Sequence, residues 1–450
     1  MPHPVDVDGD VGIVGGRRPE ALTEPRRSGG VLRRIGEVTG TRKEAPDLLA
    51  VDVVVIGGGP GGSAAAIELA RSGRSVVLID KAVFPRDKCC GDGLTTLALR
   101  ELEHLGFDGT DVSDWQEVDG AVIRAPSGLE IRVPLPDQGL YAAITPRLQL
   151  DDALIRLARS HGVDVRDGSA FSSVERHDDH IVVRADGLEV TARYVIAADG
   201  MWSPVRKAVA PHRTPYLGEW HGARQYASGV TGRAADELFV WFEPDLIPGY
   251  AWSFPLPGGR TNVGFGVLRS DGRKGKEMKE LWDALVQRPH IAEALGPDFR
   301  LDDRSTAWPI PARVDQIELA VDRVLFVGDA AAATDVMTGE GIGQALLTGR
   351  LAAESVIAAG ALRPDQASEF YRAEVHHHLF ADHKMSLLLN RILASDRGAS
   401  GALRIVANSG TWGKRNFARW MFEDEPRALV ATPSRWHRKL LGRPGAYSDR

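Results

Sequence analysis

A strand, a glycine-rich turn and a helix near residue 50 constrain the fold of this chain more than any other feature. The apolar run from Val53 to Ile56 predicts a buried strand, and residues 57–62 (GGGPGG) follow it in G-x-G-x-x-G spacing. A helical pattern runs from Gly62 to Ser72, and a second apolar strand from Ser75 to Ile79 leads into Asp80. This order is typical of a βαβ unit that binds a dinucleotide.

Each residue of this turn has a mechanical role. Gly57 permits the tight turn, Gly59 lets the backbone approach a pyrophosphate, and Gly62 allows close packing of the helix. The helix N-terminus stabilises phosphate charge, and Asp80 would accept hydrogen bonds from ribose hydroxyl groups. The turn alone does not distinguish NAD from FAD. The residues expected at the dinucleotide are Gly57, Gly59, Pro60, Gly62, Asp80 and Lys81.

Length and composition are those of a globular protein with more than one core. The chain has 450 residues, 43% of them hydrophobic and 26% charged, and a formal net charge of −6, which does not favour nucleic acid as a partner. No apolar run reaches the roughly 18 residues of a membrane span, and the N-terminus lacks the order of a secretory signal. We therefore expect a soluble or peripheral protein of the cytoplasm.

The only two cysteines, Cys89 and Cys90, are neighbours in the chain. Adjacent cysteines rarely pair, because the ring that they would close is strained. We therefore expect no disulfide framework, and two free thiols suit a reducing cytoplasm. Whether these thiols do more than fill space depends on the residues around them.

Two further segments combine an aspartate with a glycine after an apolar strand. Residues 197–206 (AADGMWSPVR) fit the pattern D-G-x-x-S-x-x-R, and residues 324–331 (VLFVGDAA) carry a second glycine–aspartate pair. Both segments resemble FAD motifs of the flavoprotein hydroxylase superfamily, whose type member is p-hydroxybenzoate hydroxylase. The resemblance implies that the cofactor is FAD. The residues that it places at FAD are Asp199, Gly200, Gly328 and Asp329.

The glycine-rich segment from Thr338 to Gly343 would present a helix N-terminus to the flavin. Reduced flavin carries negative charge near N1 and O2, and free backbone N–H groups at Gly341 and Ile342 would stabilise that charge together with the helix dipole. The superfamily also uses an arginine near FAD, and Arg147 matches it at the start of a predicted helix, residues 148–160. We therefore expect all three residues at the cofactor.

A thiol-containing segment narrows the resemblance further. Residues 84–94 (FPRDKCCGDGL) resemble the P-x-x-K-x-C-G-x-G signature of the geranylgeranyl reductase family. Lys88, Cys90 and Gly91 fall on the family's positions, and the resemblance implies that they lie at FAD. Cys89 fills a position where other residue types are usual, so its presence is a departure from the pattern.

Three later segments carry the same resemblance. Residues 250–255 (YAWSFP) and 262–266 (NVGFG) match the Y-x-W-x-F-P stretch of the family and the G-x-G strand after it, and residues 416–428 look closest to its menaquinone reductases. The resemblance implies an apolar slot for the substrate. The rival interpretation is that these aromatic residues are the core of a sheet. The predicted walls of the slot are Tyr250, Trp252, Phe254 and Pro255.

The predicted fold class is α/β, with a Rossmann-like FAD-binding lobe, an inserted β-rich substrate lobe and a helical C-terminal region. Residues 1–47 are predicted to be a disordered extension. The FAD-binding lobe is expected in residues 48–114, 145–209 and 309–360, and the helical region in residues 361–450. Strands and turns should dominate the substrate lobe, residues 115–144 and 210–308. Five of its tryptophans are expected in a sheet that faces the substrate cavity, at positions 220, 241, 252, 282 and 308.

The resemblance implies reduction of an isolated carbon–carbon double bond in a polyprenyl chain, such as the isoprenoid tail of menaquinone or a geranylgeranyl lipid. Because the alkene is unactivated, hydride transfer from flavin N5 must be coupled to protonation of the other carbon in a dry, shaped channel. Cys90 is the predicted catalytic residue, either as a proton donor or as part of the pocket wall. The external reductant stays open between NAD(P)H and a protein or quinol donor.

Three other functions are compatible with the same motifs. A flavin monooxygenase would hydroxylate an aromatic or polyketide substrate, and the cysteine signature disfavours it. A flavin-dependent halogenase would carry a W-x-W-x-I-P stretch, which residues 251–255 (AWSFP) lack. A non-enzymatic lipid-binding flavoprotein would keep all of these segments, because a fold does not fix a function.

Two charged clusters lead to simpler predictions. His376, His377 and His378 lie in a helical pattern, where consecutive side chains point in different directions, so we predict no metal site. Basic and aromatic residues also gather near the C-terminus, and beside a lipid-tailed substrate they favour peripheral contact with the inner face of the cell membrane. These residues are Lys414, Arg415, Trp420, Arg435, Trp436, Arg438 and Lys439.

Overall fold

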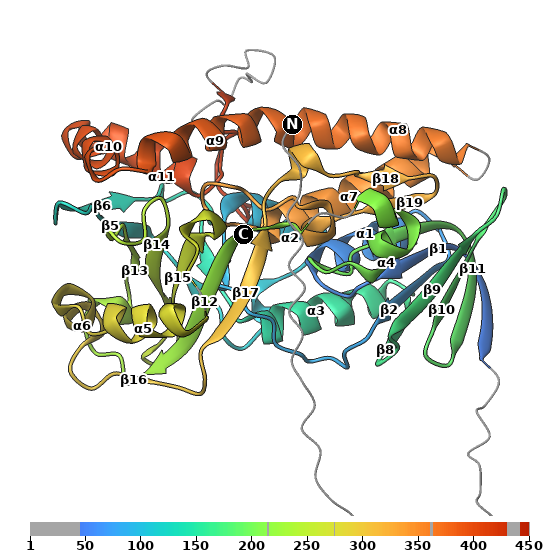
Figure 1. Cartoon of the computed structure of the whole chain (residues 1–450), viewed down its shortest axis with the longest axis horizontal. Helices are drawn as coiled ribbons and strands as arrows, with labels where there is room; N and C mark the ends of the chain where they lie inside the picture. Colours follow the sequence, from blue (N-terminus) through green and yellow to red (C-terminus); the bar gives the residue numbers. More distant parts are fainter. Residues whose placement is uncertain (1–45, 214–215, 274, 361–362, 430–441, 450) are drawn as a thin grey trace, which may run out of the picture. The chain divides into compact units, whose positions relative to one another are not determined.

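The computed structural model describes residues 46–213, 216–273, 275–360, 363–429 and 442–449. The predicted disordered extension, residues 1–47, lies outside the described residues except for its last two positions, where strand β1 (Asp47–Ile56) begins. From Ala45 onward the chain forms one compact unit. Two large sheets lie next to each other in this unit, and the C-terminal helices run across one edge of both (Figure 1).

The first sheet carries the predicted dinucleotide unit. Its parallel strands follow the order β19-β11-β1-β2-β8, and β18, β10 and β9 extend it in antiparallel pairings. Residues Val53 to Ile56 are buried at its centre, as expected of a parallel strand covered on both faces. The strands around β1 are β2 (Val76–Asp80), β8 (Asp164–Asp167), β9 (Phe171–Arg176), β10 (Ile181–Ala185), β11 (Leu188–Ala197), β18 (Ala320–Val321) and β19 (Val324–Phe326).

Helices α1 (Pro60–Arg71) and α7 (Ile342–Ala359) pack against each other through glycines. A Cβ atom at Gly349 would lie 2.1 Å from the Gly61 carbonyl oxygen, and one at Gly61 would lie 2.9 Å from that of Ala345. The two backbones therefore touch, which no larger side chain at these positions would permit. The other helices of this lobe are α2 (Thr96–His104), α3 (Arg147–Ser160) and α4 (Pro204–Val209).

The second sheet forms the floor of the substrate lobe. Its strand order is β16-β12-β15-β14-β13-β5-β6, and β17 pairs with β12 along the same edge as β16, away from β15. Neighbours are antiparallel except for β13 and β5. Its strands are β5 (Gly120–Arg124), β6 (Glu130–Pro134), β12 (Gly218–Ser228), β13 (Leu238–Trp241), β14 (Tyr250–Leu256), β15 (Arg260–Leu268), β16 (Arg300–Leu301) and β17 (Thr306–Pro311). A third, small sheet has the strand order β3-β7-β4. Its strands are β3 (Gly93–Leu94), β4 (Gln116–Glu117) and β7 (Ala143–Ile144).

Two helices interrupt the stretch where strands and turns were expected to dominate. Helices α5 (Gly275–Leu285) and α6 (Pro289–Leu295) pack on one face of the second sheet and bury an apolar cluster there. The charged residues of α5 form i,i+4 pairs, Lys276 with Glu280 and Lys279 with Asp283. That spacing is a helical signal, which the strand pattern on either side obscured.

The C-terminal region begins with α8 (Pro364–Val375) and α9 (Ala381–Leu393), which run in line across one edge of the molecule (Figure 1). The three histidines lie in the wider helical turn that joins them, His376–Phe380. Helices α10 (Asp396–Asn408) and α11 (Gly410–Met421) then pack on the second sheet, on the face away from α5 and α6. The predicted mixed α/β class with a helical C-terminal region is confirmed, whereas the lobe boundaries stay a prediction.

Two statements on ligands and membranes hold for the described residues. No group of three or more His, Cys, Asp and Glu side chains in them could hold a metal ion. None of their helices combines the length and apolar character needed to cross a bilayer.

Candidate active site

A cavity of about 1290 Å³ opens where the two lobes meet and brings the predicted cofactor segments together. Its wall contains the turn after β1, the start of the Asp199 segment, the end of β19 and the start of α7. Of the predicted cofactor residues, Gly62 is outside the wall, because it packs against Gly57 beneath the glycine turn. The residues in the wall are Gly57, Gly59, Pro60, Asp80, Lys81, Lys88, Cys90, Gly91, Arg147, Asp199, Gly200, Gly328, Asp329, Gly341 and Ile342.

The first glycine turn is as tight as its sequence predicts. A Cβ atom at Gly62 would lie 1.8 Å from the Gly57 carbonyl oxygen, and one at Gly57 would lie 2.2 Å from that of Ala198. Asp80 holds the turn from below, because its carboxylate accepts hydrogen bonds from Gly58 N (2.6 Å) and Ala82 N (2.8 Å). Ribose binding by Asp80 stays a prediction.

Positive charge gathers above Gly59. A Cβ atom there would lie 3.7 Å from Arg86 Nη2 and 3.8 Å from Arg147 Nη2. Both guanidinium groups share one partner, Asp151, which lies 2.6 Å from Arg86 Nη1 and 2.7 Å from Arg147 Nη2. Burial disfavours the charge of Arg147, but the nearby Asp151 outweighs it and raises the pKa of Arg147. Two cations against one anion, beside the N-terminus of α1, suit the pyrophosphate of a dinucleotide.

Arg147 is the first residue of α3 and only 4% exposed, so it is no surface arginine at a helix start. The sequence did not single out Arg86 or Asp151. Arg86 lies inside the thiol signature as one of its variable positions, and Asp151 stands one helical turn after Arg147. The i,i+4 spacing of Arg147 and Asp151 is the signal that could have found the pair.

The Asp199 segment mainly connects neighbouring segments of the first lobe through hydrogen bonds. The Asp199 carboxylate accepts hydrogen bonds from Ser203 Oγ (2.7 Å) and Val205 N (2.9 Å), and Ser203 caps α4. Arg206 donates to the carbonyl of Ala330, in the loop after β19. The D-G-x-x-S-x-x-R pattern thus ties the second cofactor segment to the third, while Asp199 itself stays in the cavity wall.

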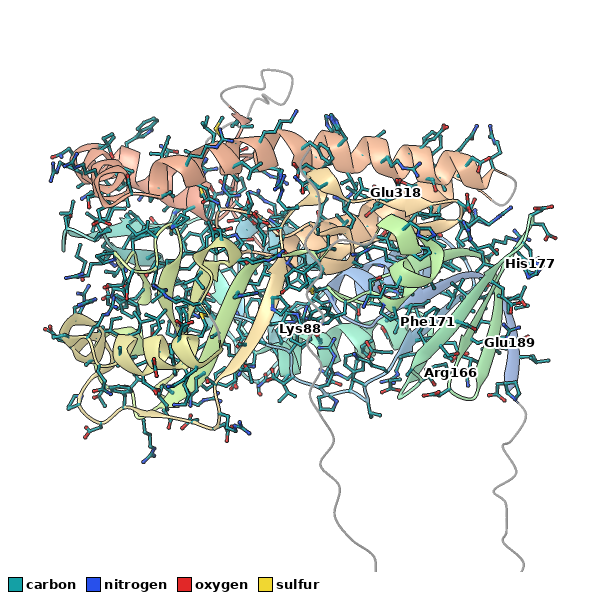
Figure 2. The ribbon with its side chains drawn as sticks, in the orientation of Figure 1. Lys88, Arg166, Phe171, His177, Glu189 and Glu318 are labelled. Atoms are coloured by element: carbon teal, nitrogen blue, oxygen red, sulfur yellow. The ribbon has the colours of Figure 1, made fainter. Side chains whose placement is uncertain are left out.

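Lys88 and Asp329 join the thiol segment to the loop after β19. Lys88 Nζ lies 2.8 Å from Asp329 Oδ2, and Lys88 is found between the two sheets in Figure 2. Both side chains are partly exposed to the cavity. Sequence resemblance placed each of them at FAD separately, and the structure adds that they are partners.

The N-terminus of α7 differs from the prediction in one respect. Its N–H groups at Ile342 and Gly343 are not free, because Glu340 Oε1 accepts from both, at 3.0 and 3.5 Å. An acidic side chain directly before a helix folds back onto the positive end of the helix dipole. Glu340 also lines the cavity, although it is not among the site residues predicted from the sequence.

Cys90 lies in the cavity wall and is partly buried. Its carbonyl oxygen accepts from Asn262 Nδ2 at 2.9 Å, and the same nitrogen donates to Asp92 Oδ2 at 2.7 Å. Burial raises the pKa of the Cys90 thiol to about 12 and that of the Asp92 carboxyl to about 6. Cys89 lies in the same wall and donates to the carbonyl of Thr306 at 3.4 Å. Cys90 is therefore a neutral thiol at neutral pH.

Three aromatic side chains of β14 form one strip along the cavity. Ring centroids of Tyr250 and Trp252, and of Trp252 and Phe254, lie 6.0 Å apart, and all three residues line the cavity. Pro255 does not line it, which corrects its predicted substrate contact. Alternate residues of a strand face opposite sides of the sheet, and Pro255 has the opposite parity. The strip is therefore Tyr250, Trp252 and Phe254.

The tryptophans of the substrate lobe divide between the two faces of the second sheet. Trp220, Trp252 and Trp308 line the cavity. Trp241 and Trp282 belong to the apolar cluster between the sheet and helices α5 and α6, and Trp282 lies in α5 itself rather than in the expected sheet. Both interpretations of the aromatic residues, as cavity wall and as sheet core, thus apply to different members of the set.

Beyond the strip the cavity becomes apolar. The second sheet contributes Ile123 from β5 and Leu238 and Val240 from β13. Helices α9, α10 and α11 and the turn after them close the other side with Leu389, Ile392, Leu393, Ala402, Leu403, Phe417, Trp420, Met421 and Phe422. Trp420, predicted as part of a membrane-facing cluster, lines the cavity, and its membrane contact stays a prediction. Arg435, Trp436, Arg438 and Lys439 of that cluster lie outside the described residues.

We call the charged part of the cavity wall, with Gly59, Arg86, Arg147, Lys88 and Asp329, the cofactor cradle. The fold and this cradle define an FAD-binding oxidoreductase, and comparison with known proteins agrees. The family model described as "FAD binding domain" matches residues 50–347. Menaquinone reductase of Mycobacterium tuberculosis is 35% identical over 328 residues, which cover 67% of this chain and 76% of that protein. Digeranylgeranylglycerophospholipid reductase 2 of Methanopyrus kandleri is 32% identical over 327 residues, covering 70% and 79%. The chain belongs to the geranylgeranyl reductase family of FAD-dependent oxidoreductases.

Solved structures share the fold at lower identity. A geranylgeranyl bacteriochlorophyll reductase-like protein from Thermoplasma acidophilum superposes with a TM-score of 0.73 at 24% identity, covering 86% of this chain and 100% of that one. The halogenase PltM in complex with FAD has a TM-score of 0.65 at 16% identity, with 85% of each chain covered. The predicted cofactor, FAD, and the predicted family are thus confirmed.

Proposed function

We propose that this protein reduces a carbon–carbon double bond in a polyprenyl chain. The observation that carries the proposal is a single cavity that runs from the charged cofactor cradle, past the aromatic strip of β14, into the apolar space under α9–α11. An isoprene chain offers no polar group for recognition, so a binding site must hold it by shape and apolar contact. The far end of this cavity has that character.

The residues of the cradle divide the work of holding FAD. Gly59, Arg86 and Arg147 would bind its pyrophosphate, and Lys88 with Asp329 would lie along the chain that joins pyrophosphate to flavin. Bound FAD, once reduced, supplies a hydride to the substrate. The protein aligns the alkene and excludes water. Both effects follow from the aromatic strip and from the apolar side chains of α9–α11, which form the roof of the cavity.

We assign Cys90 to the wall beside the reacting double bond. Its thiol stays protonated across the physiological pH range, because burial raises its pKa to about 12. Such a thiol is a poor proton donor at neutral pH, since general acids work best with a pKa near the operating pH. Cys90 therefore shapes the pocket, and replacing it with alanine should change substrate affinity more than the rate of the chemical step.

The isoprenoid tail of menaquinone is the substrate that we favour. Support comes from the menaquinone reductases of Mycobacterium tuberculosis and Mycolicibacterium smegmatis, 35% and 33% identical to this chain. Geranylgeranyl lipids are the second candidate, because the archaeal relatives are named for that class.

We further propose that the outer faces of α9–α11 rest on a membrane, from which the lipid enters the cavity. Leu388, Ile392, Ile405 and Trp412 are 50–73% exposed on these helices, and Ile392 also lines the cavity. Exposed basic residues flank them, as in helices that lie at a lipid surface. These are Lys384, Arg391, Arg404 and Arg415.

Flotation of an Ile405→Ser/Trp412→Ser variant with vesicles containing anionic lipid tests this membrane contact. Phe370→Ser on α8 is the matched control, and equal flotation of the double variant and the native protein would contradict the proposal.

The test of the proposed function uses the purified, FAD-loaded protein reduced under anaerobic conditions. Menaquinone, geranylgeranyl diphosphate and an aromatic acid are supplied separately, and flavin reoxidation and product mass are followed. We expect reoxidation by a polyprenyl compound with a gain of two hydrogens. Addition of an oxygen atom to the aromatic acid would instead identify a monooxygenase, and failure of all three to reoxidise the flavin would reject the reductase.

A further inference from the structure

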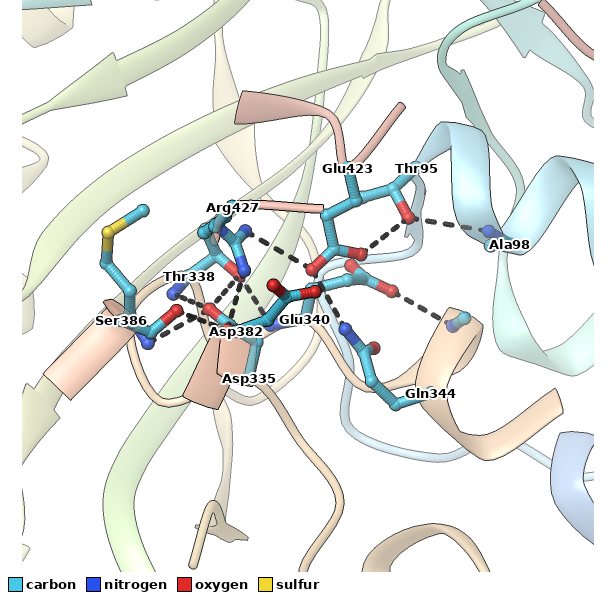
Figure 3. A network of polar contacts seen from close by, with 12 residues as sticks. Thr95, Ala98, Asp335, Thr338, Glu340, Gln344, Asp382, Ser386, Glu423 and Arg427 are labelled. Atoms are coloured by element: carbon cyan, nitrogen blue, oxygen red, sulfur yellow. Dashed lines mark hydrogen bonds and ion pairs between the residues drawn. The ribbon is translucent and has the colours of Figure 1, made fainter. Parts of the chain in front are cut away.

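A buried cluster of carboxyl groups lies where the turn after α11 meets the start of α7 (Figure 3). Asp335 and Glu423 pair with one guanidinium, that of Arg427, and the charge of Asp382 also acts on it. Glu340 is the third member of the cluster, and the charges of Glu423 and Asp335 act on it. Arg427 Nη1 lies 2.6 Å from Asp335 Oδ2, and Arg427 Nη2 lies 3.2 Å from Glu423 Oε1. One cation cannot compensate three buried anions, so the cluster is stable only if it also holds a proton.

The surroundings of Glu423 and Glu340 show where that proton resides. Glu423 accepts hydrogen bonds from Thr95 Oγ1 at 3.0 Å and Gln344 Nε2 at 2.8 Å, in addition to its pairing with Arg427. Glu340 is held by the backbone N–H groups of α7 instead. The guanidinium and two side-chain donors thus stabilise a carboxylate at Glu423, and Glu340 is left to carry the proton.

Of these three carboxyl groups, Glu340 is the one that lines the cavity. It stands between the cofactor segment at Gly341 and the first residue of the aromatic strip, Tyr250, whose hydroxyl donates to the carbonyl of Thr338. Its charge acts on both Tyr250 and the Cys90 thiol. Glu340 therefore faces the part of the cavity where cofactor and substrate segments meet.

We propose that Glu340 is the acid that protonates the substrate double bond, and that Glu423 keeps it protonated between turnovers. The inference rests on the proposed function. As the π bond of the alkene breaks, one carbon takes the hydride supplied by reduced flavin and the other takes the proton of Glu340. The O–H bond of Glu340 breaks and a C–H bond forms. The alkene is reduced by two electrons, the flavin is oxidised, and the Glu340 carboxylate regains a proton from water.

The electrostatics agree with this geometry. Burial, reinforced by the charge of Glu423, raises the pKa of Glu340 to about 8, although the N–H groups of Ile342 and Gly343 oppose the shift. Burial also raises the pKa of Glu423, to about 6. At Asp335 the effect of burial is outweighed by Arg427 together with the hydrogen bonds from Thr338 and Ser386, so its pKa is lowered. Ionisable groups that face Glu340 from the neighbouring elements are Asp335, Glu423, Arg427, Tyr250 and Cys90.

A Glu340→Gln variant tests the role in turnover, since it keeps the shape and removes the acid. With FAD bound and flavin prereduced, we expect its single-turnover rate at pH 7 to be about 100-fold or more below that of the native protein. The native rate should fall as the pH rises through about 8, where Glu340 loses its proton, and the variant should not show this limb. Glu354→Gln is the matched control, because Glu354 lies on α7, the helix that follows Glu340, and forms an ion pair with Arg350 at the surface. A Glu340→Gln rate within threefold of native would overturn the proposal.

An infrared measurement without substrate separates this inference from the proposed function. The FAD-bound native protein should show the carbonyl band of a protonated carboxylic acid at pH 7, which titrates near pH 8 and is missing in Glu340→Gln. In Glu423→Gln the titration should move to lower pH, because a charge that raises the pKa of Glu340 is gone. Absence of the band from the native protein overturns the assignment of Glu340, whether or not a polyprenyl compound is reduced.

Discussion

The cavity has two buried charge clusters with opposite imbalances. Near Gly59, Arg86 and Arg147 share a single carboxylate, Asp151. At the start of α7, Asp335 and Glu423 pair with a single guanidinium, Arg427, and Glu340 adds a third carboxyl group beside them. An excess of buried cations is relieved when an anionic ligand binds, whereas an excess of buried acids is relieved by protons. The first cluster is therefore suited to hold phosphate and the second to hold a transferable proton.

Removal of Arg427 should have the largest effect on this contrast. In Arg427→Met the acid-rich cluster loses its cation, and we expect the free energy of unfolding at pH 7 to fall by about 3–5 kcal/mol. The loss should shrink at pH 5, because protons then neutralise the carboxylates. Urea unfolding of the FAD-bound protein at both pH values measures this, with Arg415→Met on the exposed side of α11 as control. Equal losses at pH 5 and pH 7 would contradict the acid-excess interpretation.

The cation-rich cluster should respond through its ligand. Arg147→Met removes one of the two guanidinium groups near Gly59, and we expect FAD affinity to fall about 100-fold, in the range for a truncated buried charge contact. Titration of the apoprotein with FAD, followed by flavin fluorescence, measures the affinity. Arg159→Met on the exposed face of α3 should leave it unchanged. An Arg147→Met affinity close to native would remove this cluster from the cofactor site.

A smaller effect is expected on stability when Glu340 becomes glutamine. The folded-state pKa of Glu340, about 8, exceeds its ordinary value of 4.5, so its proton stabilises the fold below pH 4.5 and this contribution is lost as the pH rises to 8. The Glu340→Gln variant has no titrating group at this position, so its stability does not fall in this way as the pH rises. Relative to the native protein, the variant should gain on the order of 2 kcal/mol between pH 5 and pH 9. A parallel pH dependence of the two proteins would show that Glu340 titrates normally.

The smallest change concerns Thr95, which donates to Glu423 and caps α2. Thr95→Val should lower the free energy of unfolding by about 1 kcal/mol and make Glu423 easier to protonate. Thr95→Ser keeps the hydroxyl and should stay within about 0.5 kcal/mol of the native protein. Denaturant titration compares the two, and an equal cost for both substitutions would assign the effect to packing rather than to the hydroxyl.

Local patterns in the sequence were sufficient to find the segments that meet in the charged half of the cavity. The glycine turn, the Asp199 segment and the Gly328–Asp329 pair each follow a strand and were found from spacing and resemblance. The acid-rich cluster was missed because its members come from the loop before α7 and the turn after α11, which only tertiary folding brings together. Its one local signal was Glu340, an acidic residue set between two glycines.

Errors in the substrate half have similar physical origins. Pro255 was assigned to the slot with its neighbours because the resemblance covers a continuous stretch, whereas a strand alternates its faces. The five tryptophans were treated as one set, although Trp241 and Trp282 pack away from the cavity. Helices α5 and α6 were overlooked because strand-like segments border them on both sides. Which face of a sheet is covered by helices is a tertiary property that composition does not encode.

The contact between α1 and α7 through Gly61 and Gly349 limits how this enzyme can move. Because the two backbones touch, neither helix can slide or tilt without a clash, so the N-terminal ends of α1 and α7 keep a constant separation. The cofactor cradle is therefore expected to stay rigid. Entry of a long lipid must therefore be accommodated by displacement of α9–α11, and the rate of product release should follow the mobility of that roof.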